Sequence, residues 1–416
     1  MKTTGLIWAF MLSLLAAPLF AGEAEDANSK AFLEGLKGIN EKALGEEKLH
    51  FVMFRSVLGE GVLNVSKGAF EGTECYVVKI TFSFAFGAEK NEITNVAHIA
   101  PDLTLLHEEG TEKSNGEVDK SRTVTYKDGV YTVVMLEPKA KSEADRKVTV
   151  EVKKTWNLLM GAADLLSNRL LPTDAKTYAF VTFDGDSGET YPATVEAIKD
   201  LDSTRFVHTQ TEAEKKDGEI TTKVVTNTVW LKDSKFVRVV FDNGVSLETT
   251  PPAKLTPLTE EAAAKLDSEM AAVALFFYAQ QSRNEDTMKK AVNISRFTDM
   301  VFEKDERLKN ATPEEKEMYK PMVEATIAQN LMGPEQEDAK EKARNAAVVK
   351  LILQKENFIV SKDGETVWVT FHDELRGPFG DLKFQVEKTE KGEWQVVWIE
   401  SGDDKADEEE DGEDGF

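Results

Sequence analysis

Apolar and polar residues alternate along much of the first half of the chain, and this two-residue period predicts β-strands. Two alternating segments, Thr123–Tyr126 and Val130–Val134, stand on either side of Asp128 and Gly129. An Asp-Gly pair is typical of a two-residue hairpin turn, because both positions of that turn need positive φ. We therefore predict an antiparallel β-rich domain over residues 48–252.

Two features interrupt or repeat within this region. Residues Thr155–Leu171 have a helical pattern and are followed by Pro172, so one central helix is predicted. Thr123–Asp128 resembles Thr228–Asp233, 105 residues later, and a pair of valines follows each segment. Two similar halves around one helix favour a curved sheet or half-barrel. Chance similarity between two amphipathic hairpins is the alternative.

The pattern changes again on both sides of the β-rich region. Before it, residues 22–47 are polar, with one helical stripe that indicates a leader segment and a short helix. After it, Thr259 is placed to cap a helix whose apolar stripe includes Leu266 and Phe277. More helices and then four strand-like segments follow, so residues 257–400 are predicted as an α+β domain.

The first 21 residues have the pattern of a signal peptide. Lys2 precedes the apolar run Leu6–Phe20, which is short for a membrane span, and Ala21-Gly22 is a plausible cleavage site. An uncleaved anchor is the alternative. No later segment of the sequence is long and apolar enough to span a bilayer, so no transmembrane segment is expected after cleavage. We predict an exported protein, periplasmic or extracellular.

Charge and cysteine content exclude several classes of function. The 51 Lys and Arg residues against 75 Asp and Glu give a net charge of −24, which argues against binding to nucleic acid or to anionic lipid. One Cys and five His argue against a disulfide framework and a metal centre, so no metal and no cofactor are predicted. Residues 401–416 hold nine acids and are predicted to be a disordered tail, or a segment that attracts a cationic partner.

The C-terminal domain resembles the cone-shaped fold of nuclear transport factor 2 and the ketosteroid-isomerase-like proteins. The residues that carry this resemblance are the helix segment Ala274–Ala279 and the strand segments Asp363–Val369 and Gly392–Val397. It covers about a third of the chain and rests mostly on patterning. The resemblance implies a bent sheet around a pocket. Some members of that group are enzymes, and many are binding or dimerisation modules.

The β-rich region is similar to uncharacterised bacterial periplasmic domains related to lipoprotein carriers. The similarity lies in Leu170-Leu171-Pro172 at the end of the predicted helix, in Lys176–Asp184 and in Val229–Asp233. It implies a half-barrel with an apolar concave face, and it brings no catalytic residues.

Two motifs invite a catalytic or metal-binding interpretation. Gly185-Asp186-Ser187-Gly188, with His98 and Asp102, copies pieces of chymotrypsin-like proteases in the right order. Because His98 and Asp102 are only four residues apart and Gly188 is not followed by Gly-Pro, a hairpin turn is favoured. His107-Glu108-Glu109 lacks a second His at ligand spacing, so a solvated loop is predicted there.

The candidate ligand-binding residues of the C-terminal domain are Trp368, His372, Trp394 and Trp398. Strand alternation places Trp368 and His372 on one face of their strand and places Trp394, Val396 and Trp398 on a common face of another. These side chains could line a pocket with His372 as its polar group. Alternatives are a hydrophobic core, a dimer face, or a catalytic pair of His372 with Asp373 or Glu374.

Together these patterns predict an exported, non-enzymatic binding or scaffold protein of the cell envelope, with no catalytic residues. Its expected partner is an apolar small molecule or another envelope protein, and a homodimer is compatible with the sequence. The alternative is a small-molecule enzyme of the ketosteroid-isomerase-like class, an isomerase, dehydratase or hydrolase, that uses His372 and a nearby carboxylate.

Overall fold

The computed structural model describes residues 23–400 except 141–145, 184–188, 201, 217–218, 243, 334–338, 373–374 and 376–381. The predicted signal peptide with its Ala21-Gly22 cleavage site and the acidic tail therefore lie outside the described residues. The chain divides into two compact units. The first runs to Pro252 without Phe54–Ser56, and the second comprises those three residues and the chain from Ala253.

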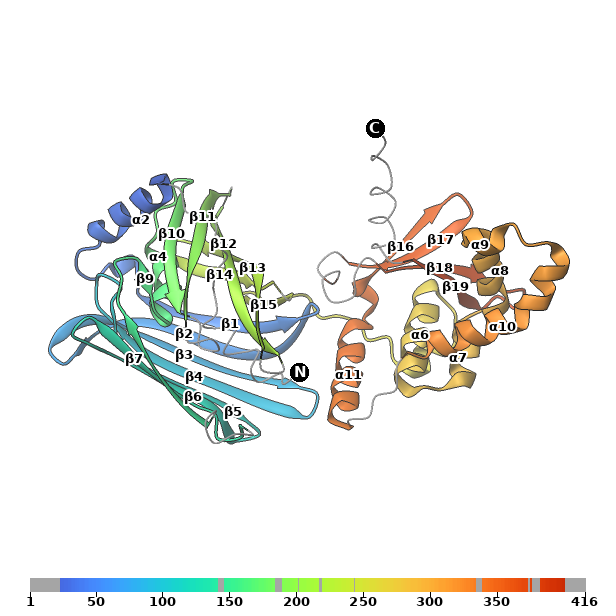
Figure 1. The fold of residues 1–416 in the computed structure, drawn as a ribbon, viewed down its shortest axis with the longest axis horizontal. Helices are drawn as coiled ribbons and strands as arrows, with labels where there is room; N and C mark the ends of the chain where they lie inside the picture. Colours follow the sequence, from blue (N-terminus) through green and yellow to red (C-terminus); the bar gives the residue numbers. More distant parts are fainter. Residues whose placement is uncertain are drawn as a thin grey trace. The chain divides into compact units, whose positions relative to one another are not determined.

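The fold is mixed α+β, and a 15-stranded, almost wholly antiparallel sheet forms the N-terminal unit (Figure 1). The strands of the first half are β1 (Gly45–Met53), β2 (Ser56–Phe70), β3 (Thr73–Phe86), β4 (Glu89–Ile99), β5 (Leu105–Ser114), β6 (Glu117–Lys127), β7 (Val130–Leu136) and β8 (Lys147–Lys153). Those of the second half are β9 (Leu158–Leu159), β10 (Thr177–Phe183), β11 (Thr190–Lys199), β12 (Thr204–Lys216), β13 (Glu219–Lys232), β14 (Lys235–Val240) and β15 (Val245–Glu248).

The strand order shows two meanders joined at their ends. β1 to β8 follow one another across the sheet, and β15 to β9 continue from β1 in the other direction. Pairing of Phe51 with Leu247 joins the first and last strands. The β6–β7 hairpin of one half recurs as the β13–β14 hairpin of the other, at the spacing of the predicted repeat. Common origin of the halves stays a prediction.

Alternation predicted these strands correctly because one face of the sheet covers a core and the other is more exposed. In β4 the residues Asn91, Ile93 and Asn95 are buried, whereas Glu92 and Thr94 between them are exposed. The Asp128-Gly129 turn is confirmed, since both residues have positive φ, 51° and 84°. Asp233 and Ser234 make the equivalent turn between β13 and β14.

Replacing Gly129 with Ala is expected to lower the free energy of unfolding by about 1–2 kcal/mol, because a residue with a Cβ is strained at this positive φ. Nothing lies within 4 Å of the added Cβ, so the cost is conformational and not steric. Urea unfolding of Gly129→Ala and of the unchanged protein measures this change in the free energy of unfolding. Gly35→Ala is the control, because Gly35 also has open space but no positive φ. Equal effects of the two variants would contradict the argument.

Two α-helices accompany the sheet in the described part of this unit. α2 (Glu23–Gly35) packs on β10, where Phe32 meets the rings of Tyr178 and Phe180 at 6.0 and 6.3 Å. The predicted helix at 155–171 is only partly correct, because α4 spans Ala162–Leu170. The earlier residues Leu158 and Leu159 instead form β9, which pairs in parallel with β10.

The C-terminal unit combines helices with a four-stranded antiparallel sheet in the order β16-β17-β18-β19. Its helices are α5 (Glu260–Ala263), α6 (Glu269–Ser282), α7 (Glu285–Ala291), α8 (Ile294–Lys304), α9 (Glu306–Lys309), α10 (Pro313–Leu331) and α11 (Ala339–Ile352). Its strands are β16 (Phe358–Asp363), β17 (Thr366–Phe371), β18 (Lys383–Lys388) and β19 (Trp394–Glu400).

Thr259 caps a helix as predicted, and its hydroxyl accepts a hydrogen bond from the Ala262 amide at 3.2 Å. The expected stripe from Leu266 to Phe277 does not lie on one helix, however. α5 ends at Ala263, Leu266 follows it with a φ of 50°, and Ser268 caps α6 anew. Burial then covers every residue of α6 from Ala271 to Ala279, so α6 is the central helix of this unit.

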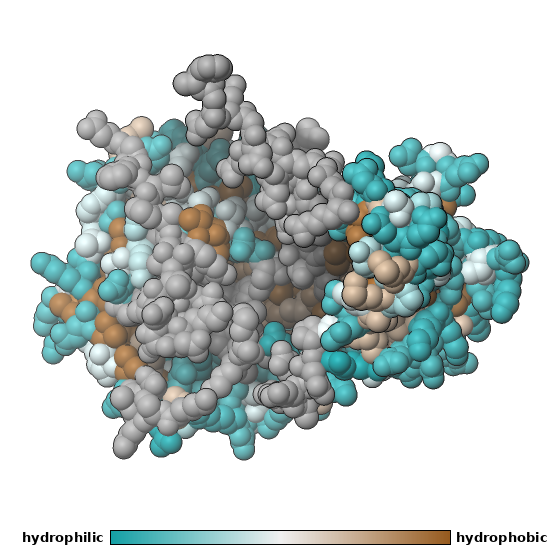
Figure 2. Space-filling view, turned by 45° about the vertical axis from the view of Figure 1, so that its right-hand side comes forward, coloured by the Kyte–Doolittle hydropathy of each residue, from teal (hydrophilic) through white to brown (hydrophobic). Residues whose placement is uncertain are grey.

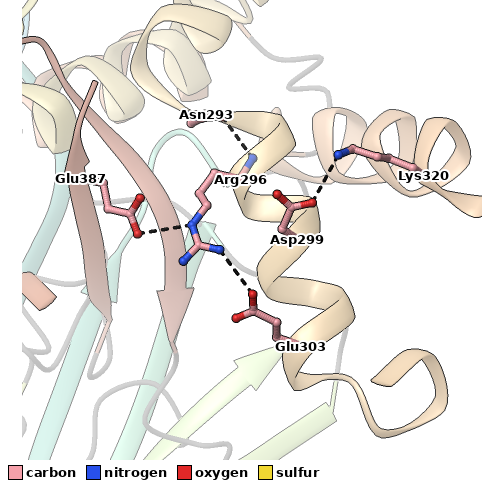
Figure 3. Close-up of polar contacts among 6 residues, drawn as sticks. All are labelled: Asn293, Arg296, Asp299, Glu303, Lys320 and Glu387. Carbon is pink, nitrogen blue, oxygen red and sulfur yellow. Dashed lines mark hydrogen bonds and ion pairs between the residues drawn. The ribbon is translucent and has the colours of Figure 1, made fainter. Parts of the chain in front are cut away.

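Charged side chains attach α8 to the neighbouring strand and helix (Figure 3). Arg296 lies 3.4 Å from Glu387 of β18 and 3.4 Å from Glu303, two turns further along α8. Asp299 contacts Lys320 of α10 at 3.3 Å. These pairs are partly exposed, so they orient the helix more than they stabilise it.

Where Figure 2 is not grey, the surface is mainly hydrophilic, with scattered hydrophobic patches. Such single exposed apolar residues are normal for folded proteins. Among the residues that the structure describes, no helix has the length and apolar character needed to cross a membrane.

Candidate ligand-binding site

A small cavity of about 60 Å³ lies inside the N-terminal unit, between α4 and the concave face of the sheet. Figure 1 shows the sheet bent so that its two halves face each other on either side of this helix. Apolar side chains line the cavity from both halves. They include Leu63 and Phe82 of β2 and β3, Val229 and Val239 of β13 and β14, and Leu165 of α4.

One carboxyl group stands in this apolar lining. Asp164, in the first turn of α4, is 8% exposed, and its carboxylate has no partner among the described residues. Burial raises its pKa to about 7. A polar group in an apolar cavity, with a strongly shifted pKa, is a typical feature of a binding site.

Two other polar residues of the lining already have partners. The Asn168 side chain donates from Nδ2 to the Asp164 carbonyl at 3.1 Å, and its Oδ1 lies 2.7 Å from Nε2 of His208. Burial lowers the pKa of His208 to about 4, so its neutral ring donates to Asn168. Asn227 accepts from the Asp242 amide at 3.1 Å. Asp164 is therefore the cavity's available polar group.

A buried ion pair holds the N-terminus of α4. The Glu108 carboxylate pairs with Arg122 and accepts from the Ala162 amide at 2.8 Å. A negative charge is favourable at this end of a helix. Gly161 precedes the helix with a φ of 56°, and a Cβ there would press on Glu108 and Arg122, so only glycine fits.

A second buried pair holds the C-terminus of the same helix. Arg169 pairs with Glu47 at the start of β1 and donates to the Ala43 carbonyl at 2.8 Å. Its guanidinium also lies 5.1 Å from the ring centre of Phe236. Because cations favour the C-terminal end of a helix, both ends of α4 are held by charges of the favourable sign. The helix thus closes the cavity as one braced element.

The residues predicted to form a C-terminal pocket are not all on one face. A bulge in β19 pairs Val396 with Val386 but Trp398 with Gln385. The prediction that Trp394, Val396 and Trp398 share a face is therefore wrong, because the extra residue reverses the alternation. Trp368 also pairs with Gln385, so Trp368 and Trp398 share the face opposite to Trp394 and Val396.

Aromatic side chains occupy the sheet face beneath α6. Phe277 lies 5.8 Å from Phe371 and 5.7 Å from Phe384, and Phe276 lies 5.8 Å from Phe384. Trp398, on the other face of the sheet, packs on Phe297 of α8 at 5.1 Å. The His372 amide donates to the Asn357 carbonyl at 2.9 Å. Its suggested catalytic partners, Asp373 and Glu374, lie outside the described residues.

A cavity of about 300 Å³ in this unit lies elsewhere, between the end of α6 and the helices α10 and α11. Phe277, Gln280, Met332 and Val349 are among its lining residues. None of the four predicted ligand-binding residues, Trp368, His372, Trp394 and Trp398, lines it.

The protease-like residues are not brought together in the part of the chain that is described. Asp102 accepts from the Thr104 amide at 3.0 Å and lies 3.7 Å from Lys154. His98 instead packs beside Phe70 and His107, with ring centres 4.9 and 6.3 Å away. The expected turn at Gly185-Asp186-Ser187-Gly188 lies outside the described residues.

The predicted solvated loop at His107-Glu108-Glu109 is wrong, because these residues belong to β5. Glu108 is fully buried and braces α4, a role that the sequence analysis missed. The sequence contained a signal for this buried position of Glu108, namely its spacing from a second glutamate. Glu108 and Glu112 lie four residues apart in a polar strand, which places both on one face.

No group of three or more His, Cys, Asp or Glu side chains that could hold a metal occurs among the described residues.

No protein-family model matches this chain, and no curated protein matches it. Among solved structures, it is similar to the crystal structure of a β-barrel-like protein of the domain of unknown function DUF1849 from Brucella abortus. The two share 16% sequence identity, with a TM-score of 0.32. The match covers 49% of this chain and 92% of that chain.

Proposed function

We propose that the chain is an exported, non-enzymatic binding protein of the cell envelope, and that its N-terminal unit takes up an apolar ligand behind α4. The observation that carries this proposal is the apolar cavity with the unpartnered, buried carboxyl group of Asp164. A core built only for stability gains nothing from such a group, because burying it without a hydrogen bond is unfavourable. An apolar ligand that fills the cavity would lie against this carboxyl group, which burial keeps protonated and neutral below about pH 7.

The size of the cavity indicates how a ligand would enter. About 60 Å³ is well below the roughly 300–1,000 Å³ of ordinary ligand pockets. A ligand with an alkyl chain therefore needs α4 to move away from the sheet. The helix is short, with nine residues, and the ion pairs at its two ends would return it to the closed position. This mode of entry agrees with the half-barrel resemblance, which we extend here to a carrier of apolar molecules.

For the C-terminal unit we propose docking to another envelope protein or to a second copy, as in the non-enzymatic members of the cone-fold group. The packing of Phe277 on Phe371 and Phe384 supports this choice over an isomerase-like enzyme, because these rings occupy the space beneath α6 that a substrate would need. No observation on His372 favours the enzymatic alternative.

A fluorescent apolar probe tests the binding proposal. N-phenylnaphthylamine, which brightens in apolar surroundings, is expected to bind the full chain saturably. Leu165 lines the cavity and Leu170 does not, although both are half-buried on α4. Leu165→Phe fills the cavity, so it is expected to weaken binding by about tenfold or more.

Leu170→Phe is the matched control and should bind the probe as the unchanged protein does. Decanol, added as a competitor, should displace the probe from the unchanged protein and from Leu170→Phe. Saturable binding that survives Leu165→Phe unchanged would place the ligand elsewhere. No saturable binding at all would refute the proposed function.

A further inference from the structure

Three buried polar side chains of the N-terminal unit lie on β4 and β5, the two strands that α4 also contacts. Glu112 lies on β5 opposite Ile93 of β4, and Asn91 and Asn95 stand two residues to either side of Ile93. All three therefore share the face of Ile93. We call Asn91, Asn95 and Glu112 the polar subsite.

The polar subsite adjoins the apolar cavity. Asn95 lies opposite Ile80, and Ile93 lies opposite Phe82, and both of these β3 residues line the cavity. Neighbouring strands are about 4.8 Å apart, so Glu112 stands roughly 10 Å across the sheet from Phe82. A chain of ten carbon atoms is long enough to connect the two places.

The oxygen atoms of the polar subsite have no hydrogen-bond donors. Glu112 is 0% exposed, Asn91 4% and Asn95 3%. Both carboxyl oxygens of Glu112 and the side-chain oxygens of the two asparagines are buried without a partner among the described residues. Four unsatisfied acceptors together are rare in folded proteins, because each buried polar atom normally has a partner.

The cations nearest to Glu112 are already engaged by other carboxylates. Lys120, directly across from Glu112 on β6, lies 2.7 Å from Glu137. The other pairs are Lys139 with Asp119 at 2.7 Å, Lys139 with Glu117 at 2.9 Å, and Arg122 with Glu108. The polar subsite therefore has a carboxyl group and two amide oxygens to offer to a donor from outside the chain.

We propose that the polar subsite binds the ammonium group of an amphiphilic amine whose apolar chain lies in the cavity behind α4. A primary ammonium has three N–H donors and no acceptor, so it can donate to both oxygens of Glu112 and to one of the two flanking amide oxygens, which stand about 13 Å apart along β4. Bonds from an ammonium to a carboxylate are also stronger than those from a neutral hydroxyl. The inference rests on the proposed function and adds the chemical class of the ligand.

The proposal has a pH signature. Burial raises the pKa of Glu112 to about 8; Lys120 lowers it, and Asp119 and Glu137 raise it further. On the same face of β5 and β6, Lys120 pairs with Glu137, and Glu108 and Arg122 further along the strands pair with each other. Below pH 8 the empty polar subsite holds a protonated Glu112, which must release its proton when an ammonium binds. Affinity is therefore expected to rise about tenfold per pH unit up to pH 8 and then to level off.

Isothermal titration calorimetry with decylammonium and decan-1-ol on the full chain tests this inference. At pH 8 decylammonium is expected to bind at least about tenfold more tightly than decanol. Glu112→Gln should reduce decylammonium to the affinity of decanol and leave decanol unchanged. This variant should fold, because Gln has the shape and neutrality of protonated Glu. Proton release, measured at pH 7 in two buffers of different ionisation enthalpy, should disappear in the same variant.

Glu109→Gln is the matched control. Glu109 lies on the same strand, on the opposite face, with its side chain 72% exposed, and its replacement should change nothing. The inference is overturned if Glu112→Gln keeps the preference for decylammonium, or if millimolar calcium displaces the amine and so identifies a metal-ion site. If decanol binds and the ammonium adds no affinity, the inference fails and the proposed function stands. If neither compound binds, the proposed function itself fails.

Discussion

Replacing Arg122 with Met is expected to destabilise the N-terminal unit by about 3–5 kcal/mol, because it leaves Glu108 buried without its cation. The side chains of Arg122 and Glu108 are only 8% and 0% exposed. Glu108 also accepts from the Ala162 amide, so the loss reaches the N-terminus of α4. Urea unfolding at pH 7, followed by near-ultraviolet circular dichroism, measures the change in the free energy of unfolding.

Two comparisons isolate the cause. The double variant Glu108→Gln, Arg122→Met removes both charges and should recover a large part of the loss, because a lone buried charge costs more than a missing pair. Lys67→Met breaks an exposed pair with Glu41, and we expect a change below about 1 kcal/mol. If Arg122→Met costs no more than Lys67→Met, the buried pair does not brace α4.

Replacing Asp164 with Asn is expected to raise the free energy of unfolding at pH 8 by about 2–4 kcal/mol and to change it by less than about 1 kcal/mol at pH 4. Burial raises the pKa of Asp164 from 3.8 to about 7 in the folded protein. Well below pH 3.8 the group is protonated in both the folded and the unfolded state and costs nothing. As pH rises towards 7 the unfolded chain ionises first, so the folded state loses stability, and above pH 7 the loss is complete. Asn cannot ionise, so the variant escapes this loss.

Urea unfolding from pH 4 to pH 8 follows the difference between the two proteins. Asp267→Asn is the control, because Asp267 is exposed and its replacement should leave the pH dependence as it is. A constant difference between Asp164→Asn and the unchanged protein across this range would mean that Asp164 is not held neutral in the cavity.

The strands of the N-terminal unit were predictable because their alternation reflects burial on one face only. The Asp128-Gly129 turn was predictable for a local reason, the positive φ of both residues. The start of α4 was not predictable from the sequence. Leu158 and Leu159 fit a helical pattern, but their pairing with Val181 and Thr182 in β10 is a long-range contact that periodicity does not contain.

The candidate site was predictable in kind but not in its residues. An apolar concave face was expected from the resemblance to carrier-related domains, yet the groups that give it chemistry were missed. Asp164 sits in a helix that looked amphipathic, and Glu108 looked like part of a loop. Charge buried against a distant partner leaves no local pattern. In the C-terminal unit, the one-residue bulge before Trp398 likewise follows from pairing with Gln385 and not from β19 itself.

Native mass spectrometry of the full-length protein, purified from the cells that make it, tests the central claim most directly. We predict a mass above that of the chain alone, from an apolar molecule that is released on denaturation and that Leu165→Phe reduces. Only the mass of the empty chain, as a monomer or as twice the monomer, in both the unchanged protein and the variant would contradict a ligand carried behind α4.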